Sequence, residues 1–180
     1  MPEAIESYVP QNFAVEMRRQ AFVVWGVFAL VIFVWLLAIV LAPLAEANGL
    51  MSVADPIYKF FGYICHQIPD RSMHLREHAL AVCSRCFGVY FGLFFGFVVY
   101  PLMRRIEETE PFPRVWLFLA MIPMGVDWSL GFFEIWENTH LSRFLSGAIL
   151  GAACGIFIVP ALVELFALFV GKRHRKKPSV

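Results

Sequence analysis

Four long stretches of apolar residues constrain this chain more than any other feature. A helix rises about 1.5 Å per residue, so roughly 20 residues cross the 30 Å hydrocarbon core of a bilayer. The stretches cover residues 21–42, 86–103, 115–133 and 144–170, and only the last two contain a charged residue. We therefore predict an all-α membrane protein with four transmembrane helices, built as one integral membrane domain over residues 1–180.

The composition supports this prediction. The chain is 59% hydrophobic and only 16% charged, which is too apolar for a soluble fold of 180 residues. A net charge of +1 excludes a nucleic-acid-binding protein driven by bulk charge, so the expected partner is the lipid bilayer. Residues 45–47 resemble a signal-peptidase site, but an apolar run of about 22 residues is longer than that of a removable signal.

The distribution of cations predicts the orientation. If both termini share one side, ten Lys and Arg residues fall on that side and five on the other. The positive-inside rule then places both termini in the cytoplasm of a multi-pass cell-membrane protein, with residues 43–82 and 134–142 outside. The ten are Arg18, Arg19, Arg104, Arg105, Arg114, Lys172, Arg173, Arg175, Lys176 and Lys177; the five are Lys59, Arg71, Arg76, Arg85 and Arg143.

The second and fourth apolar stretches repeat one pattern of glycines. Each has three glycines at every fourth position and a proline thirteen positions after the first glycine. Glycines spaced in this way form a stripe along which two membrane helices can approach closely. We therefore expect two parallel-related helical hairpins whose second and fourth helices pack at the centre, although the stripes also suit contacts in a homo- or hetero-oligomer. The repeated residues are Gly88, Gly92, Gly96 and Pro101, and Gly147, Gly151, Gly155 and Pro160.

The segment between the first two stretches contains most of the reactive side chains. Asp55-Pro56 resembles a helix start and predicts a short interfacial helix over residues 57–63. A turn at Pro69-Asp70 and a second short helix should then lead to Cys83 and Cys86. This C-x-x-C pair can hold a metal ion with two thiolates.

Further ligands lie nearby in the sequence. Cys65 and His66 can complete a tetrahedral zinc site with Cys83 and Cys86, and His78 is the alternative imidazole ligand. Residues 74–78 spell H-x-x-E-H, the order found in one class of zinc peptidases, but a loop of some forty residues is too short for such a domain.

The cysteine motifs are similar to those of a known group. The run C-H-Q-x-P-x-R-S from Cys65 and the run C-x-R-C-x-G-x-Y-x-G from Cys83 resemble an uncharacterised family of small prokaryotic integral membrane proteins. The resemblance extends more weakly to Asp127 and Arg143. This chain departs from the expected pattern at Trp128, where a glycine is expected after Asp127, and at His140, where an asparagine is expected. The family has no established activity, so the resemblance indicates the site more than the function.

Asp127 is a carboxylate within the third apolar stretch. Such a group is costly in hydrocarbon unless it is paired, which predicts either a functional residue or an ion pair with Arg85 or Arg143. These three residues are the catalytic candidates. Gly131, Glu134 and Asn138 follow Asp127 at helical intervals and should share its helix face.

Four arginines on the expected outer side also suggest an anionic lipid headgroup or phosphate as a partner. They are Arg71, Arg76, Arg85 and Arg143.

Three function classes follow from these residues. The first is a membrane protein with an extracytoplasmic zinc site above a polar intramembrane pocket. The second is a quinone-coupled thiol–disulfide oxidoreductase that uses Cys83 and Cys86, although only Cys65 remains outside to act with this pair. The third is a non-catalytic subunit or scaffold whose glycine stripes bind a partner helix.

Overall fold

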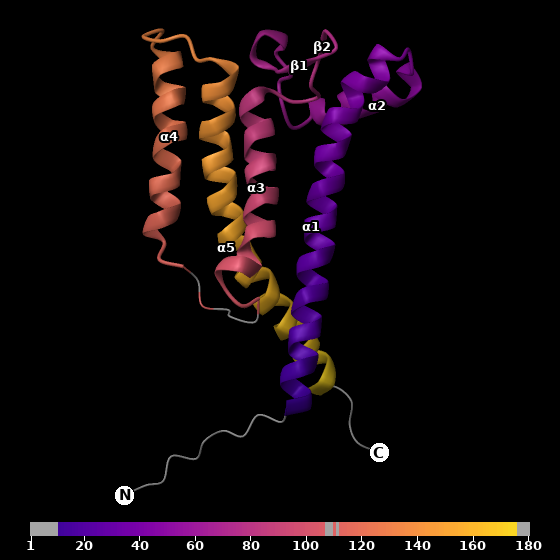
Figure 1. Cartoon of the computed structure of the whole chain (residues 1–180), viewed down its shortest axis with the longest axis vertical. Coiled ribbons are helices and arrows are strands. Elements are labelled where there is room, and N and C mark those ends of the chain that lie inside the picture. The colour runs from indigo at the N-terminus through magenta and orange to yellow at the C-terminus, as the bar shows by residue number, and fades with distance from the viewer. Residues whose placement is uncertain (1–10, 107–109, 111, 176–180) are drawn as a thin grey trace, which may run out of the picture.

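A computed structural model describes residues 11–106, 110 and 112–175 of the chain (Figure 1). Lys176 and Lys177, which contribute to the predicted orientation, lie outside the described residues. The elements are α1 (Gln11–Ala47), α2 (Met51–Gly62), a 3-10 helix (Pro69–Arg71), β1 (His74–Leu75), β2 (His78–Ala79), α3 (Ser84–Met103), α4 (Val115–Phe132) and α5 (His140–Arg175).

Four of these helices are long and apolar enough to cross a membrane. They are α1 from Arg18, α3, α4, and α5 as far as Phe166. This confirms the predicted all-α membrane protein with four spans. Both α1 and α5 extend beyond the apolar stretches that predicted them, because an α-helix makes its own backbone hydrogen bonds and can continue past the hydrocarbon core into water.

The centre of the bundle is the pair α3 and α5, which stand side by side between α4 and α1 (Figure 1). A Cβ atom placed on any of the six striped glycines would collide with a backbone carbonyl oxygen of the facing helix. The two backbones are therefore in direct contact, as the glycine pattern predicts.

The contacts are reciprocal. Each striped glycine faces the residue three positions before the corresponding glycine of the other helix, which relates α3 and α5 by an approximate two-fold axis along the bundle. This arrangement confirms that the repeat packs within one chain. Gly88, Gly92 and Gly96 face Phe144, Ala148 and Ala152, while Gly147, Gly151 and Gly155 face Arg85, Val89 and Leu93.

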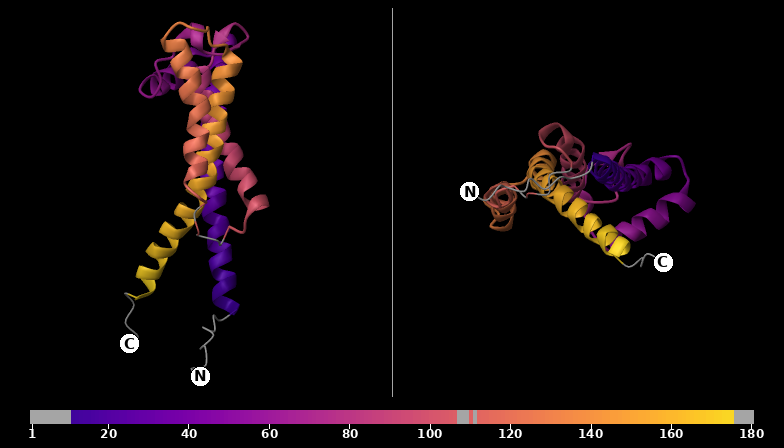
Figure 2. Two further views of the ribbon diagram at one scale, coloured as in Figure 1. Left: turned by 90° about the vertical axis from the view of Figure 1, so that its left-hand side faces the viewer. Right: turned by 90° about the horizontal axis from the view of Figure 1, so that it is seen from below.

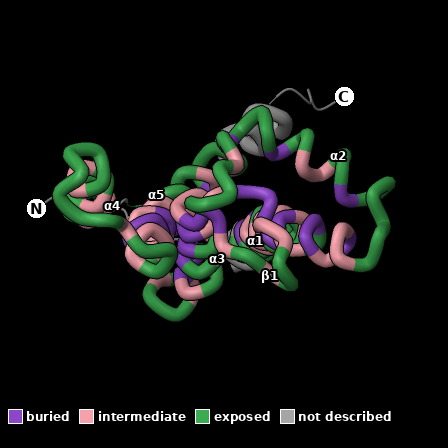
Figure 3. Tube along the Cα trace, turned by 90° about the horizontal axis from the view of Figure 1, so that it is seen from above, coloured by how far each residue is buried: buried purple, intermediate pink, exposed green. Residues whose placement is uncertain are grey.

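The outer helices are held more loosely. In α4 only Ala120 is buried, and Figure 3 shows this helix as mainly exposed at the edge of the bundle.

The helix α1 is joined to the centre by a side-chain hydrogen bond. The indole N–H of Trp25 in α1 donates to the carbonyl oxygen of Phe97 in α3 at 2.7 Å. The C-terminal half of α5, beyond Pro160, leans away from α4 (Figure 2). Large apolar side chains on these outer faces are exposed, as expected where lipid is the solvent.

One end of the bundle gathers the segments between the helices, and we call it the cysteine end. It contains the end of α1, α2, the β1–β2 hairpin, the starts of α3 and α5, and the end of α4 (Figure 1). A cluster of buried residues packs this end together. Its fully or nearly buried members are Ile39, Ala42, Phe61, Cys65, Leu80, Ala81 and Val82.

Two local predictions at the cysteine end are wrong. The helix expected to start at Asp55-Pro56 begins at Met51, because Gly49 adopts a φ of 73° that ends α1 and turns the chain directly into α2. The second short helix expected before Cys83 is a two-stranded hairpin. Its turn residues, Arg76 and Glu77, have φ values of 51° and 69°, the geometry of the tight turns that join antiparallel strands.

Candidate metal centre

Three cysteines meet at the cysteine end. The sulfur atoms of Cys65, Cys83 and Cys86 all lie within 4.8 Å of one another. Among the described residues, these three form the group of His, Cys, Asp or Glu side chains whose ligand atoms lie close enough together to bind one metal ion. Cys65 follows α2, Cys83 immediately precedes α3, and Cys86 lies in the first turn of α3. In a tetrahedral zinc site with Zn–S bonds of about 2.3 Å, two sulfur ligands lie about 3.8 Å apart. The distances between the three cysteine sulfurs are therefore close to those of a metal-binding arrangement.

Backbone hydrogen bonds hold the two cysteine segments together. The N–H of Cys83 donates to the sulfur of Cys65 at 3.3 Å. The side-chain amide of Gln67 donates to the carbonyl oxygens of Tyr58 and Ala81, each at 2.8 Å. Gln67 therefore links α2 to the segment between β2 and Cys83, and it fixes the position of Cys65 two residues earlier.

The cluster favours the thiolate form of Cys65. Hydrogen bonds from the thiols of Cys83 and Cys86 hold the pKa of the Cys65 thiol far below its usual range, although burial acts in the opposite direction. Cys65 is only 6% exposed. A thiolate is the form that binds metal ions or attacks disulfides.

The two candidate histidines lie in different places. His66 is exposed and lines the same cavity as the three cysteines. His78 is half-buried on β2, and its Nδ1 lies 3.2 Å from Oε2 of Glu46 at the end of α1. The identity of a fourth ligand therefore stays a prediction. His66 lies on the side of the cavity, whereas His78 contacts Glu46 of α1.

Asp127 forms an ion pair with Arg85, which confirms one of its two predicted partners. The pair joins α4 to the first turn of α3, and both side chains are largely buried, at 20% exposed for Arg85 and 11% for Asp127. The Nε of Arg85 is buried and has no hydrogen-bond partner within the described part of the chain.

The predicted helix face that continues from Asp127 to Asn138 is wrong, because α4 ends at Phe132 and Glu134 has a φ of 55°. The chain turns back after this point. Asn138 nevertheless reaches Asp127, since its side-chain amide donates to the Asp127 carbonyl oxygen. The same side chain fills the space beside Gly131.

A cavity of about 530 Å³ opens beside the cysteines. Its walls come from the segment after α2, the starts of α3 and α5, and the end of α4, so segments far apart in the sequence enclose it. Besides Cys65, Cys83 and Cys86, the lining includes His66, Arg71, Arg85, Trp128, Glu134, Asn138 and Arg143. Next to it, Ser84 Oγ and His140 Nδ1, in the first residues of α3 and α5, are 3.0 Å apart.

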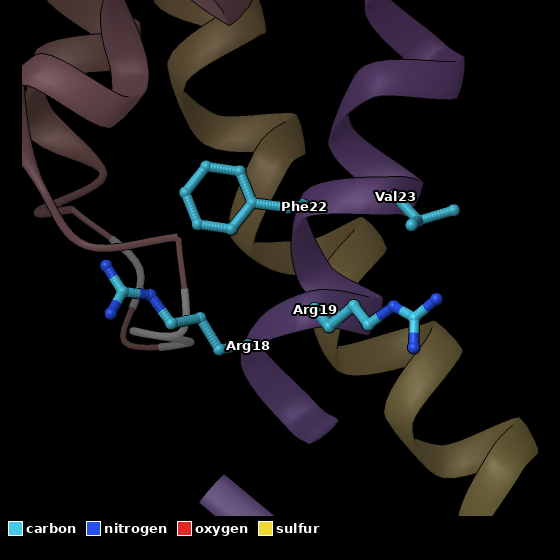
Figure 4. Close-up of a pocket in the computed structure, with 4 residues that line it drawn as sticks. All are labelled: Arg18, Arg19, Phe22 and Val23. Atoms are coloured by element: carbon cyan, nitrogen blue, oxygen red, sulfur yellow. The ribbon is translucent and has the colours of Figure 1, made fainter. Parts of the chain in front are cut away.

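A second hollow lies at the opposite end of the bundle, on the surface of α1 (Figure 4). Its lining residues are Arg18, Arg19, Phe22 and Val23, and the Arg18 guanidinium lies 5.9 Å from the centre of the Phe22 ring. This lining contains no thiol, imidazole or carboxylate among the residues the structure describes. The two arginines instead mark the end of the first apolar stretch, as arginines do at membrane surfaces.

The four spans and the cysteine end define a multi-pass integral membrane protein. The chain belongs to the family described as "Predicted membrane protein (DUF2085)", which matches residues 65–157. This match confirms the resemblance to an uncharacterised family, and it begins at the first cysteine of the cluster.

Two relatives are themselves uncharacterised. A protein of Methanocaldococcus jannaschii is 33% identical over 138 residues, which cover 73% of this chain and 88% of that protein. A protein of Methanothermobacter thermautotrophicus is 31% identical over 110 residues, which cover 61% of this chain and 96% of the relative. No solved structure matches the chain.

Proposed function

We propose that this integral membrane protein binds a zinc ion through Cys65, Cys83 and Cys86 at the outer face of the cell membrane. The observation that carries the proposal is the convergence of three sulfurs from two separate segments within 4.8 Å. Three thiolates favour zinc over hard cations such as calcium and magnesium, which prefer oxygen ligands.

A fourth ligand of the ion would come from the cavity that the three cysteines line. His66 is the better candidate for it, since it lines that cavity, whereas His78 is directed to Glu46. Three protein ligands with one open position are typical of catalytic zinc, and four are typical of structural zinc. Arg85, Arg143 and Asp127 provide charged groups beside the ion, and an anionic headgroup or phosphate is the partner they suit.

We also propose that the cysteine end lies outside the cell and that both termini are cytoplasmic. The excess of cations at the opposite end supports this orientation. An epitope inserted at Asp70 should bind antibody on intact spheroplasts, whereas a C-terminal epitope should do so only after lysis. The reverse pattern would exclude an outer metal site.

The metal proposal is tested by elemental analysis of the purified protein together with a count of free thiols. We expect one zinc per chain, lost in Cys65→Ser, Cys83→Ser and Cys86→Ser. Cys154→Ser is the matched control, because Cys154 lies in α5 and is not part of the cluster. Cobalt substitution should add thiolate-to-metal absorption bands that disappear in the same three variants.

Thiol–disulfide exchange at Cys83 and Cys86, coupled to a quinone, is the second candidate. The position of Cys65 supports it, since a sulfur within 4.8 Å of the pair could exchange, as a thiolate, with a Cys83–Cys86 disulfide. A metal-free preparation with that disulfide formed would support this candidate and contradict the zinc proposal.

A further inference from the structure

The cavity beside the cysteines contains cations that lack partners. Arg71 and Arg143 line it, and neither side chain forms an ion pair or hydrogen bond within the described part of the chain. Arg85 is different, because Asp127 balances its charge. Glu134 is the carboxylate in the lining, and it is exposed.

Two helix starts add to this positive potential. The lining includes residues from the first turns of α3, which begins at Ser84, and of α5, which begins at His140, and the positive end of a helix dipole favours an anion. Arg85 and Arg143 lie in these first turns, a position that is electrostatically unfavourable for a cation. The helix dipoles would attract a bound anion, and the anion would reduce the repulsion between these dipoles and the two arginines.

Part of the cavity wall is aromatic. Trp128 and Phe132, at the end of the spanning helix α4, stack with ring centres 5.0 Å apart. Both residues are more than half exposed, at 54% and 64%. A cavity with arginines on one side and exposed aromatic rings of a membrane helix on the other suits a molecule that is anionic at one end and apolar at the other.

We infer that this cavity binds the phosphate group of a membrane lipid, with the phosphate between Arg71 and Arg143 and the lipid chain along Trp128 and Phe132. A guanidinium group is planar and can donate two parallel hydrogen bonds to two oxygens of one phosphate. This geometry favours a phosphate over an anion with a single acceptor atom, such as chloride. The inference rests on the proposed function in one respect, since the zinc ion would form the floor of the same cavity. Free phosphate shares the chemistry and is distinguished by experiment.

The test uses the full chain in nanodiscs of phosphatidylcholine that contain a small fraction of phosphatidic acid with brominated chains. Bromine quenches nearby indoles, and Trp128 lies in the cavity wall. We expect brominated phosphatidic acid to quench more strongly than brominated phosphatidylcholine at the same fraction. Trp128→Phe should remove this selective part of the quenching, because the four other tryptophans do not line the cavity.

Three variants test the charges. Arg143→Gln should weaken the apparent affinity for phosphatidic acid by at least about tenfold, the effect of losing one charge-assisted contact. Glu134→Gln should strengthen it, because it removes the opposing carboxylate. Arg76→Gln is the matched control, since Arg76 is an exposed arginine at the same end that does not line the cavity.

The outcomes are distinct. If inorganic phosphate binds with the same dependence on Arg143 but lipid selectivity is missing, the phosphate site stands and the lipid source is overturned. If Arg143→Gln and Arg76→Gln behave alike, the whole inference is overturned. Zinc measured in the same preparations separates the two proposals: zinc without lipid selectivity contradicts only this inference, and selectivity without zinc contradicts only the proposed metal site.

Discussion

The middle of the bundle and the cysteine end are built in different ways. In the middle, α3 and α5 contact each other through backbone atoms along six glycines, and the spacing repeats without interruption. At the cysteine end, side chains from α2, the hairpin segment, and one end of each of the four long helices meet irregularly. The first region depends on the absence of side chains, and the second depends on particular side-chain atoms. Damage to each region should therefore have a different consequence.

The largest effect is expected in the middle. Gly92→Ala would place a Cβ against the backbone of Ala148, which cannot yield as a flexible side chain would. Separating two packed helices should cost about 3 kcal/mol or more of unfolding free energy, the upper end of overpacking effects. Unfolding by denaturing detergent, followed by circular dichroism, measures this cost.

Gly26→Ala is the matched control, because a Cβ at Gly26 in α1 meets nothing within 4 Å. It should be neutral or stabilise α1 by up to about 1 kcal/mol, the helix propensity difference. Equal destabilisation by the two variants would show that glycine content, and not the α3–α5 contact, matters.

The next effect is at the boundary between the two regions. Asp127→Asn should cost about 2 to 3 kcal/mol, because it leaves the largely buried guanidinium of Arg85 without its counter-ion. Adding Arg85→Gln should restore part of the loss, and a double-mutant cycle measures the coupling. Zinc content should stay unchanged in Asp127→Asn. Strictly additive losses would argue against a direct ion pair.

The two regions also differ in how much of their structure the sequence predicts. The four spans and the α3–α5 contact were predictable, because helix length and glycine spacing are local patterns that the membrane enforces. Cys83 and Cys86 were predictable as a pair from their spacing. The positions of His66 and His78 relative to the cysteines were not predictable, because they depend on the path of an irregular segment.

The wrong predictions concern the places where the chain turns. The hairpin turn at Arg76 and Glu77 contains no glycine, asparagine or proline to indicate it. The ends of α1 and α4 have a glycine nearby, Gly49 and Gly131, but other glycines of this chain lie inside helices, so a glycine alone does not indicate a turn. Gln67 belongs to the C-H-Q motif, but its hydrogen bonds and that of Ser84 are not predictable from the sequence, since each residue bonds to a group distant along the chain. Such contacts leave no periodic pattern.

Gln67 provides a smaller effect that is confined to the cysteine end. Gln67→Leu removes the two hydrogen bonds to the carbonyl oxygens of Tyr58 and Ala81, which should cost about 2 kcal/mol, at about 1 kcal/mol for each. Hydrogen exchange should rise in residues 65–83 and stay unchanged in the glycine-packed parts of α3 and α5. Apparent zinc affinity should also fall, because Cys65 is no longer fixed beside Cys83. Uniform exchange across the chain would mean that the two regions unfold together.

The smallest effect concerns the contact between the starts of the two central helices. Ser84 is fully buried, and its hydroxyl lies 3.0 Å from Nδ1 of His140. Ser84→Ala should cost about 1 kcal/mol, the net value of one hydrogen bond, while His140→Asn, which keeps a polar partner, should cost less. If the glycine contact alone aligns α3 and α5, neither variant should change zinc content. If the cysteine end depends on this alignment, Ser84→Ala should lower zinc affinity although Ser84 is not a ligand, because it fixes the segment between Cys83 and Cys86. Zinc titration of the two variants beside the unchanged chain decides whether the two regions are coupled.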